Sequence, residues 1–158
     1  AMKKVSEELW LLREVGLPLK SPLEAIILAS IVEKETGLVE ERRRVASVFI
    51  NRLRLGMRLQ SDPTVIYGLT NGNRRLSRPL KRKDLKSPNP YNTYLNKGLP
   101  PGPISNPGRA SIKAVLNPIE STDLYFVADG KGGHAFAKTL KEHNKNVKVL
   151  RKFERERN

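Results

Sequence analysis

The sequence predicts an α+β domain in which a helical core carries one small antiparallel β-sheet. Apolar residues recur at helical spacing in successive segments, and two short strand-like segments near the C-terminal end are separated by a glycine-rich turn. The 158 residues are enough for one domain with a core of its own. Since the chain has no cysteine, disulfides and cysteine-ligated zinc are excluded.

The N-terminal segment, residues 3–15, is predicted to be the first helix. Val5, Leu9 and Leu12 recur at helical spacing, with Leu11 and Val15 nearby. Gly16, followed closely by a proline, is expected to end this helix.

The second helix is predicted to begin after Ser21 and to stop at Gly37. Ser21 can cap the helix, Pro22 suits the first helical position, and Glu24 stands where a capping box places its acidic residue. A glycine directly after the last turn is a common helix terminator.

The third helix is predicted over residues 40–55 and ends before Gly56. Most of its arginines lie on the face opposite its inner stripe. The inner stripe consists of Val45, Val48, Phe49, Arg52 and Leu53.

The rest of the chain alternates between irregular and short regular segments. Residues 57–110 hold most of the Pro, Gly and Asn and are expected to be a long irregular segment, which in a compact domain is usually functional or mobile. A short helix is predicted over residues 109–116. Residues 124–129 indicate a buried strand and residues 134–139 its antiparallel partner, before a charged tail that is helical or frayed.

The composition favours a folded domain with an anionic partner. Hydrophobic residues at 38% and charged residues at 29% exclude both a disordered chain and a membrane-embedded one. The net charge of +14 suits nucleic acid, an acidic membrane face or an acidic polymer, although a basic soluble surface alone would also explain it. With only two histidines, His134 and His143, we expect no protein-only metal site and no cofactor.

The second helix is apolar until it ends in two glutamates, Glu33 and Glu35. Glu35 continues the most apolar stripe, which contains Leu28, Ile31 and Val32. Residues two apart point about 200° apart around a helix, so the two carboxylates cannot act as a pair. A carboxyl at the rim of an apolar helix loses hydration, and the resulting rise in its pKa suits a general acid. The residues alone also allow a plain solvated helix end.

Six motifs in order resemble those of the YceG-like endolytic murein transglycosylases. They are LASIVEKET, VASVFINRL, RLQSDPTVIYG, YNTY, the proline-rich GLPPGPISNPG and LYFVADGKGGH with the EHN that follows it. The resemblance covers about residues 10–149. It implies a lysozyme-like catalytic helix and non-hydrolytic cleavage of the MurNAc-β-1,4-GlcNAc bond of peptidoglycan, which leaves a 1,6-anhydro-MurNAc end.

The resemblance places the catalytic glutamate in the segment Ile31 to Thr36. Related lytic transglycosylases have a serine directly after their acid, and Thr36 occupies that position after Glu35. Together with the apolar stripe, this favours Glu35 as the catalytic residue and leaves Glu33 as the second choice.

The other motifs are expected to supply the groove for the glycan, through aromatic faces for sugar rings and polar groups for hydroxyls and acetamides. For several of these residues a purely structural role is equally open, and Asp62 before Pro63 reads more readily as a helix cap. The expected substrate-binding residues are Asn51, Gln60, Asp62, Tyr67, Tyr91, Asn92, Thr93, Tyr94, Asn106, His134 and Phe136. His134 and Phe136 alternate on one predicted strand and should therefore share a face.

The resemblance also implies a setting for the domain. Residues 1–158 are expected to form a single catalytic domain of a longer protein, held at the outer face of the plasma membrane by an N-terminal anchor absent from this chain. The expected partners are peptidoglycan glycan strands and peptidoglycan synthases, with no nucleic acid. Two alternatives stay open on the sequence: a basic nucleic-acid-binding module and a non-catalytic glycan-binding domain.

Overall fold

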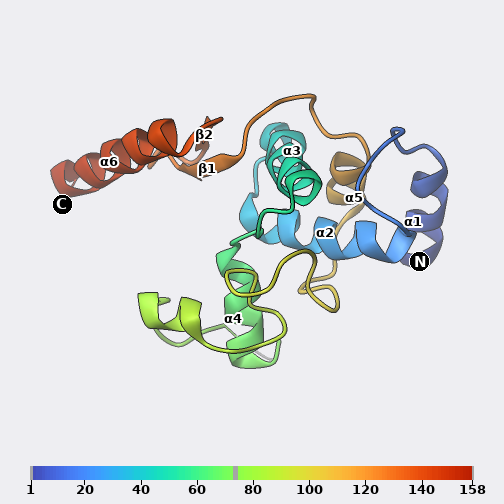
Figure 1. The fold of residues 1–158 in the computed structure, drawn as a ribbon, viewed down its shortest axis with the longest axis horizontal. Helices are drawn as coiled ribbons and strands as arrows, with labels where there is room; N and C mark the ends of the chain where they lie inside the picture. The colour runs from blue at the N-terminus through green and yellow to red at the C-terminus, as the bar shows by residue number, and fades with distance from the viewer. Residues whose placement is uncertain (1, 73–74, 158) are drawn as a thin grey trace.

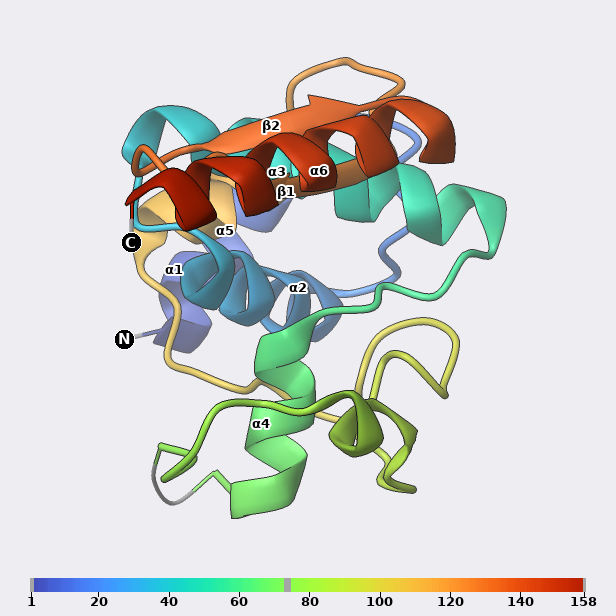
Figure 2. The ribbon, with the colours of Figure 1, turned by 90° about the vertical axis from the view of Figure 1, so that its left-hand side faces the viewer.

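The computed structural model describes residues 2–72 and 75–157 and has the predicted α+β architecture (Figure 1). The helical core consists of α1 (Met2–Leu11), α2 (Pro22–Glu35), α3 (Val39–Leu55) and α5 (Arg109–Leu116). On one side of this core lie α4 (Asp62–Thr70) and the 3-10 helix η1 (Arg82–Lys86), as Figure 2 shows. On the other side lie the hairpin of β1 (Tyr125–Ala128) and β2 (His134–Ala137), and α6 (Leu140–Arg157).

Helix α2 runs through the centre of the core. Its start is fixed as predicted, because the Ser21 hydroxyl accepts a hydrogen bond from the Glu24 amide at 3.3 Å. The Glu24 carboxylate accepts from the Lys20 amide at 2.9 Å, one residue before the cap. All residues from Ala25 to Val32 are buried, and each large apolar side chain among them contributes roughly 1.5–3 kcal/mol by leaving water. This burial holds the C-terminal end of α2 in a fixed position.

Helix α1 is shorter than predicted, since it ends at Leu11 instead of residue 15. The apolar spacing beyond that point does not correspond to a buried stripe. Leu12 is 72% exposed and Val15 is 99% exposed, whereas Leu9 is buried in the core. Without core contacts, the last predicted turn has no packing to stabilise it.

The segment predicted to be irregular contains two helices, α4 and η1. Ser61 is the N-cap residue of α4, and Asp62 is its first residue, so the predicted cap is displaced by one position. The backbone carbonyl of Ser61 accepts from the Thr64 hydroxyl at 2.6 Å, and the Asp62 side chain makes no capping bond and is exposed. The Ser61 hydroxyl donates to the Glu35 side chain at 2.8 Å and so links the start of α4 to the end of α2.

The hairpin is antiparallel, with Phe126 opposite Phe136 and Ala128 opposite His134. The Phe126 ring packs edge-on against Phe49 of α3 at a centroid distance of 5.7 Å. The strand predicted over 124–129 is present as β1, but the prediction that it is buried was wrong, because β1 is only half-buried. A two-stranded sheet has two open edges, and here one face packs on α3 while α6 covers part of the other.

Candidate active site

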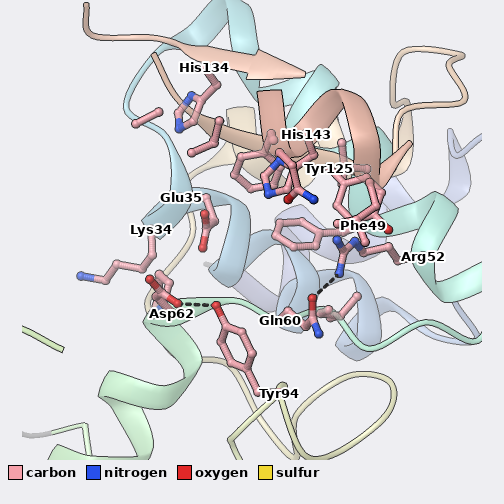
Figure 3. A pocket seen from close by; sticks show the side chains of 18 residues that line it. Lys34, Glu35, Phe49, Arg52, Gln60, Asp62, Tyr94, Tyr125, His134 and His143 are labelled. Carbon is pink, nitrogen blue, oxygen red and sulfur yellow. Dashed lines mark hydrogen bonds between the residues drawn. The ribbon is translucent and has the colours of Figure 1, made fainter. Parts of the chain in front are cut away.

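A cleft of about 620 Å³ lies where the helical core, the start of α4 and the hairpin with α6 meet (Figure 3). Its walls combine carboxylates, aromatic rings and cationic groups. The lining residues are Lys34, Glu35, Val48, Phe49, Arg52, Leu59, Gln60, Asp62, Pro63, Tyr94, Tyr125, Phe126, Val127, Ala128, His134, Leu140, His143 and Asn144.

Glu35, the last residue of α2, points into this cleft (Figure 3). Burial raises the pKa of Glu35 to about 7, and the negative charge of Asp62 adds to the rise. A hydrogen bond from the Ser61 hydroxyl at 2.8 Å and the nearby His134 act in the opposite direction. A carboxyl with this pKa is partly protonated at neutral pH and can donate a proton.

The hydroxyl that contacts Glu35 comes from Ser61, not from Thr36. The Thr36 hydroxyl instead accepts from the Leu38 amide at 3.1 Å, which stabilises the turn after α2. Ser61 is held by Thr93, whose hydroxyl accepts from the Ser61 amide at 2.9 Å. The buried Thr93 therefore acts on Glu35 through Ser61 and does not line the cleft itself.

Asp62 and Tyr94 form a second polar pair in the cleft. The Tyr94 hydroxyl donates to an Asp62 oxygen at 2.5 Å, and burial and this carboxylate together raise the pKa of Tyr94. The Tyr94 backbone is held by the side chain of Asn92, which accepts from its amide at 2.9 Å. Asp62 thus faces the same cleft as Glu35, with a neutral phenol bonded to it.

Glu33 points away from the cleft and joins three helices. One of its oxygens accepts from the amide of Gly108, the N-cap of α5, at 2.8 Å and from the Ser111 hydroxyl at 3.1 Å. The other oxygen lies 3.7 Å from Arg42 of α3. A carboxylate at a helix N-terminus is also favoured by the helix dipole. These contacts assign Glu33 to holding the core together.

Glu33→Gln should therefore lower stability and leave the chemistry of the cleft in place. Gln keeps an acceptor for Gly108 and Ser111 but loses the charge, so we expect a loss of about 1–2 kcal/mol in the free energy of unfolding. Denaturant unfolding of the variant and the wild type measures this loss. A variant that unfolds at the same denaturant concentration as the wild type would contradict this structural role.

His134 lines the cleft and is held by a residue that the sequence did not single out. The Glu41 carboxylate lies 2.6 Å from His134 Nδ1 and accepts from the His134 backbone amide at 3.0 Å. As expected, His134 and Phe136 share a face of the hairpin, with ring centroids 6.3 Å apart. Phe136, however, packs against the hydrophobic core and does not line the cleft.

The structure places several expected binding residues outside the cleft. Asn51 donates to the carbonyls of Ser121 and Asp123, both at 2.9 Å, and anchors the segment that leads into the hairpin. Asn92 is buried and donates to two backbone carbonyls of its own loop. Each amide already has partners in the fold, so a glycan-binding role is not needed to explain either residue.

Three further expected residues also lie away from Glu35. Tyr67 and Tyr91 pack on one another, with ring centroids 4.7 Å apart, against the edge of the core. Tyr67 lines a neighbouring cavity that shares the walls of Lys34 and Pro63 with the cleft. Asn106 is exposed and lies outside the cleft lining.

Gln60 lines the cleft as predicted. The cleft wall also contains residues that the sequence did not identify, among them Arg52. Gln60 has a positive φ of 52°, an uncommon conformation for a residue with a side chain, and it accepts a hydrogen bond from Arg52 at 3.3 Å. Arg52 is a charged residue on an otherwise apolar stripe of α3, which is the signal that could have identified it. Most of the other unassigned lining residues come from the hairpin and α6, and the rest from α2, α3 and the segment at the start of α4.

No group of three or more His, Cys, Asp or Glu side chains in residues 2–72 and 75–157 is arranged to hold a metal ion. Over the same ranges, no helix combines the length and the apolar character needed to cross a membrane.

A model of the YceG-like family matches residues 1–149 of this chain. An endolytic murein transglycosylase of Bacillus subtilis (strain 168) is 47% identical over 120 residues, which cover 76% of this chain and 32% of that protein. An endolytic murein transglycosylase of Streptococcus pneumoniae serotype 2 (strain D39 / NCTC 7466) is 39% identical over 127 residues, which cover 78% of this chain and 23% of that protein. The chain thus spans a third or less of the length of these two relatives.

The fold is also similar to a solved structure. A yceG-like protein from Listeria monocytogenes superposes with a TM-score of 0.72 at 49% sequence identity. The superposition covers 79% of this chain and 40% of that one.

Proposed function

Because this chain belongs to the YceG-like family, we propose that it is the catalytic domain of an endolytic lytic transglycosylase that cuts the glycan strands of peptidoglycan. The observation that carries the proposal is Glu35, a single carboxyl at the end of a buried helix, with its pKa raised to about 7 inside a cleft. The relatives named as endolytic murein transglycosylases support the substrate and the reaction class.

Glu35 performs both proton transfers of the proposed reaction. In its protonated form it donates a proton to the glycosidic oxygen between MurNAc and GlcNAc, and the C1–O bond breaks with oxocarbenium character at C1. As a carboxylate it then takes the proton from the 6-hydroxyl of the same MurNAc, whose oxygen attacks C1. The product is a 1,6-anhydro ring, and the attack is favoured over water because the hydroxyl is already part of the bound sugar.

Ser61 and Asp62 tune this acid in the proposed mechanism. The Ser61 hydroxyl donates to Glu35 and stabilises its carboxylate form after the first proton transfer. The charge of Asp62 raises the pKa of Glu35 and so favours its protonated form before that transfer. The bond from Tyr94 occupies one Asp62 oxygen, which suits a residue that tunes the acid better than one that activates water.

The product of the reaction tests this function. Incubation of the chain with uncross-linked peptidoglycan strands in H₂¹⁸O should release internal fragments that end in 1,6-anhydro-MurNAc and carry no ¹⁸O at the new end. Mass spectrometry of the fragments measures both properties. Reducing ends that contain ¹⁸O would identify a hydrolase, with Asp62 as its second carboxylate.

The place of action follows from the substrate. We propose that the domain works in the cell envelope at the outer face of the plasma membrane, as part of a longer membrane-anchored protein, where glycan strands are made by peptidoglycan synthases. The net charge of +14 suits an acidic polymer and an anionic membrane surface. Trimming or terminating new strands beside those synthases would make them its partners.

A further inference from the structure

Arg52 is a buried cation in the wall of the cleft. Only 6% of the residue is exposed. Its Nε donates to the Leu124 carbonyl at 2.7 Å, and another guanidinium nitrogen donates to the Arg58 carbonyl at 2.8 Å and to the Gln60 side chain at 3.3 Å. All three acceptors are neutral, so they orient the guanidinium without compensating its charge.

Within residues 2–72 and 75–157, no carboxylate oxygen lies within 4.0 Å of Arg52. The loss of hydration lowers the pKa of Arg52, which reflects the cost of holding this charge away from water. The aromatic ring of Tyr125 lies 5.0 Å from the guanidinium carbon and offsets a small part of that cost. An anion bound in the cleft would offset far more of it.

His143 of α6 adds a second polar group to the same wall. Its ring stacks on Tyr125 at a centroid distance of 5.1 Å, and burial together with the charge of Arg52 lowers the pKa of His143. Its Nδ1 atom is buried and has no hydrogen-bond partner in the described part of the chain. A buried polar atom without a partner is uncommon in native folds and calls for an explanation.

We propose that Arg52 and His143 form a carboxylate-binding subsite in the cleft, separate from Glu35. In Figure 3 both groups lie with Tyr125 on the side of the cleft opposite Lys34 and the start of α4. The terminal guanidinium nitrogen of Arg52 that makes none of the three bonds to neutral acceptors can donate a charge-assisted hydrogen bond to a carboxylate, and the imidazole can supply a second bond.

This inference rests on the proposed function for the identity of its ligand. A muramic acid residue presents a carboxylate in one of two ways: on its lactyl group when the stem peptide is absent, or on the stem peptide when it is present. N-acetylglucosamine presents none. The subsite would therefore fix which sugar of the strand occupies that side of the cleft and so set the register of cleavage.

The test is a titration followed by NMR chemical shifts of the wild-type chain. The probes are N-acetylmuramic acid, N-acetylmuramoyl-L-alanyl-D-isoglutamine, the fully amidated form of that dipeptide, and N-acetylglucosamine. We expect the carboxylate-bearing probes to bind about tenfold to a hundredfold more tightly than the neutral ones, as a charge-assisted pair provides. Preference for free muramic acid identifies the lactyl carboxylate, and preference for the dipeptide acid identifies the stem peptide.

Arg52→Gln should abolish this preference and leave the binding of the neutral probes unchanged. Arg54→Gln is the matched control, because it removes the same charge from an exposed position of the same helix, outside the cleft. His143→Phe keeps a ring on Tyr125 but removes Nδ1, and it should reduce the preference about threefold to tenfold. This second variant decides the question if Arg52→Gln does not fold.

Equal binding of charged and neutral probes by the wild type would overturn the proposal. An equal loss of binding of the charged and the neutral probes in Arg52→Gln would also overturn it, because Arg52 would then only support the fold. If Arg52→Gln does not fold, an unchanged preference for charged probes in His143→Phe would overturn it. None of the probes contains a glycosidic bond to cleave. A failure of the proposed chemistry therefore leaves this binding readout intact, and the two failures can be told apart.

Discussion

Replacing Glu35 by Gln is expected to abolish the cleavage of glycan strands while the fold is retained. Gln has the shape of Glu and can accept the hydrogen bond from Ser61, but it can neither donate nor take up the required proton. Since one residue performs both transfers, the loss should be on the order of a hundredfold to ten-thousandfold or more. The rate of release of 1,6-anhydro ends from purified strands measures it.

Glu33→Gln is the matched control, because it makes the same chemical change two residues away on the same helix. Glu33 contacts the start of α5 instead of the cleft, so this variant should keep its activity under conditions where it is folded. An inactive Glu33→Gln beside an active Glu35→Gln would exchange the two roles. If both variants cleave strands, the end of α2 does not hold the acid, and Asp62 becomes the candidate.

The helices that carry the site could be predicted because their signals are local. Ser21 followed by Pro22 marks the start of α2, Gly56 in a left-handed conformation closes α3, and the predicted bounds of α5 agree with the structure. The antiparallel pairing of β1 and β2 was predicted from the glycine-rich turn between them. In each case the residues that decide the conformation lie within a few positions of one another.

Only the start of α4 was predicted, one residue out, from Asp62 and Pro63; its extent was missed because the evidence for it is tertiary. It is only nine residues long and contains Gly68, which normally disfavours a helix. A Cβ on Gly68 would lie 2.5 Å from the side chain of Asn89, so the glycine is explained by close packing of a distant segment. Asn89 in turn donates to the Gly68 carbonyl at 3.2 Å. A single sequence gives no indication of such a contact.

The candidate site was predicted best where the direction of a side chain depends on one helix alone. The stripe that separates Glu35 from Glu33 is a property of α2 alone, and the two side chains do point to different environments. Ser61 contacts Glu35 and Glu41 contacts His134 across many residues of sequence, so spacing could not identify either of them. Asn92 and Thr93 show the opposite error, because a polar loop residue can bind a ligand or support the fold. Here Asn92 holds its own loop and Thr93 holds the Ser61 backbone.

The activity is expected to fall on the alkaline side of a pH profile, because the first step needs protonated Glu35. With a pKa of about 7, roughly half of the molecules carry the proton at pH 7, and above it the protonated fraction falls about tenfold per pH unit. The value of kcat/KM at pH 9 should thus be about a hundredfold below its plateau. Initial rates on soluble strands between pH 5 and 9, at constant ionic strength, measure this limb.

The same shift predicts how stability depends on pH. Between pH 4.5, the ordinary pKa of a glutamate, and about pH 7, folded Glu35 keeps a proton that the unfolded chain has released. The folded state binds more protons in this window, so its stability falls as the pH rises and then levels off above about pH 7. Relative to Glu35→Gln, the wild type should lose up to about 3 kcal/mol across the window. Denaturant unfolding of the two proteins at pH 4 and pH 8 measures the difference.

Asp62→Asn distinguishes Glu35 from any other group that could limit the activity. The negative charge of Asp62 raises the pKa of Glu35, so its removal should move the alkaline limb to lower pH. The absolute rates of the wild type and Asp62→Asn should therefore differ most between about pH 6 and pH 8. The two rates should converge at low pH, where Glu35 is protonated in both proteins. A limb that stays in place in Asp62→Asn, or a wild-type rate that is constant up to pH 9, would mean that the proton comes from another residue.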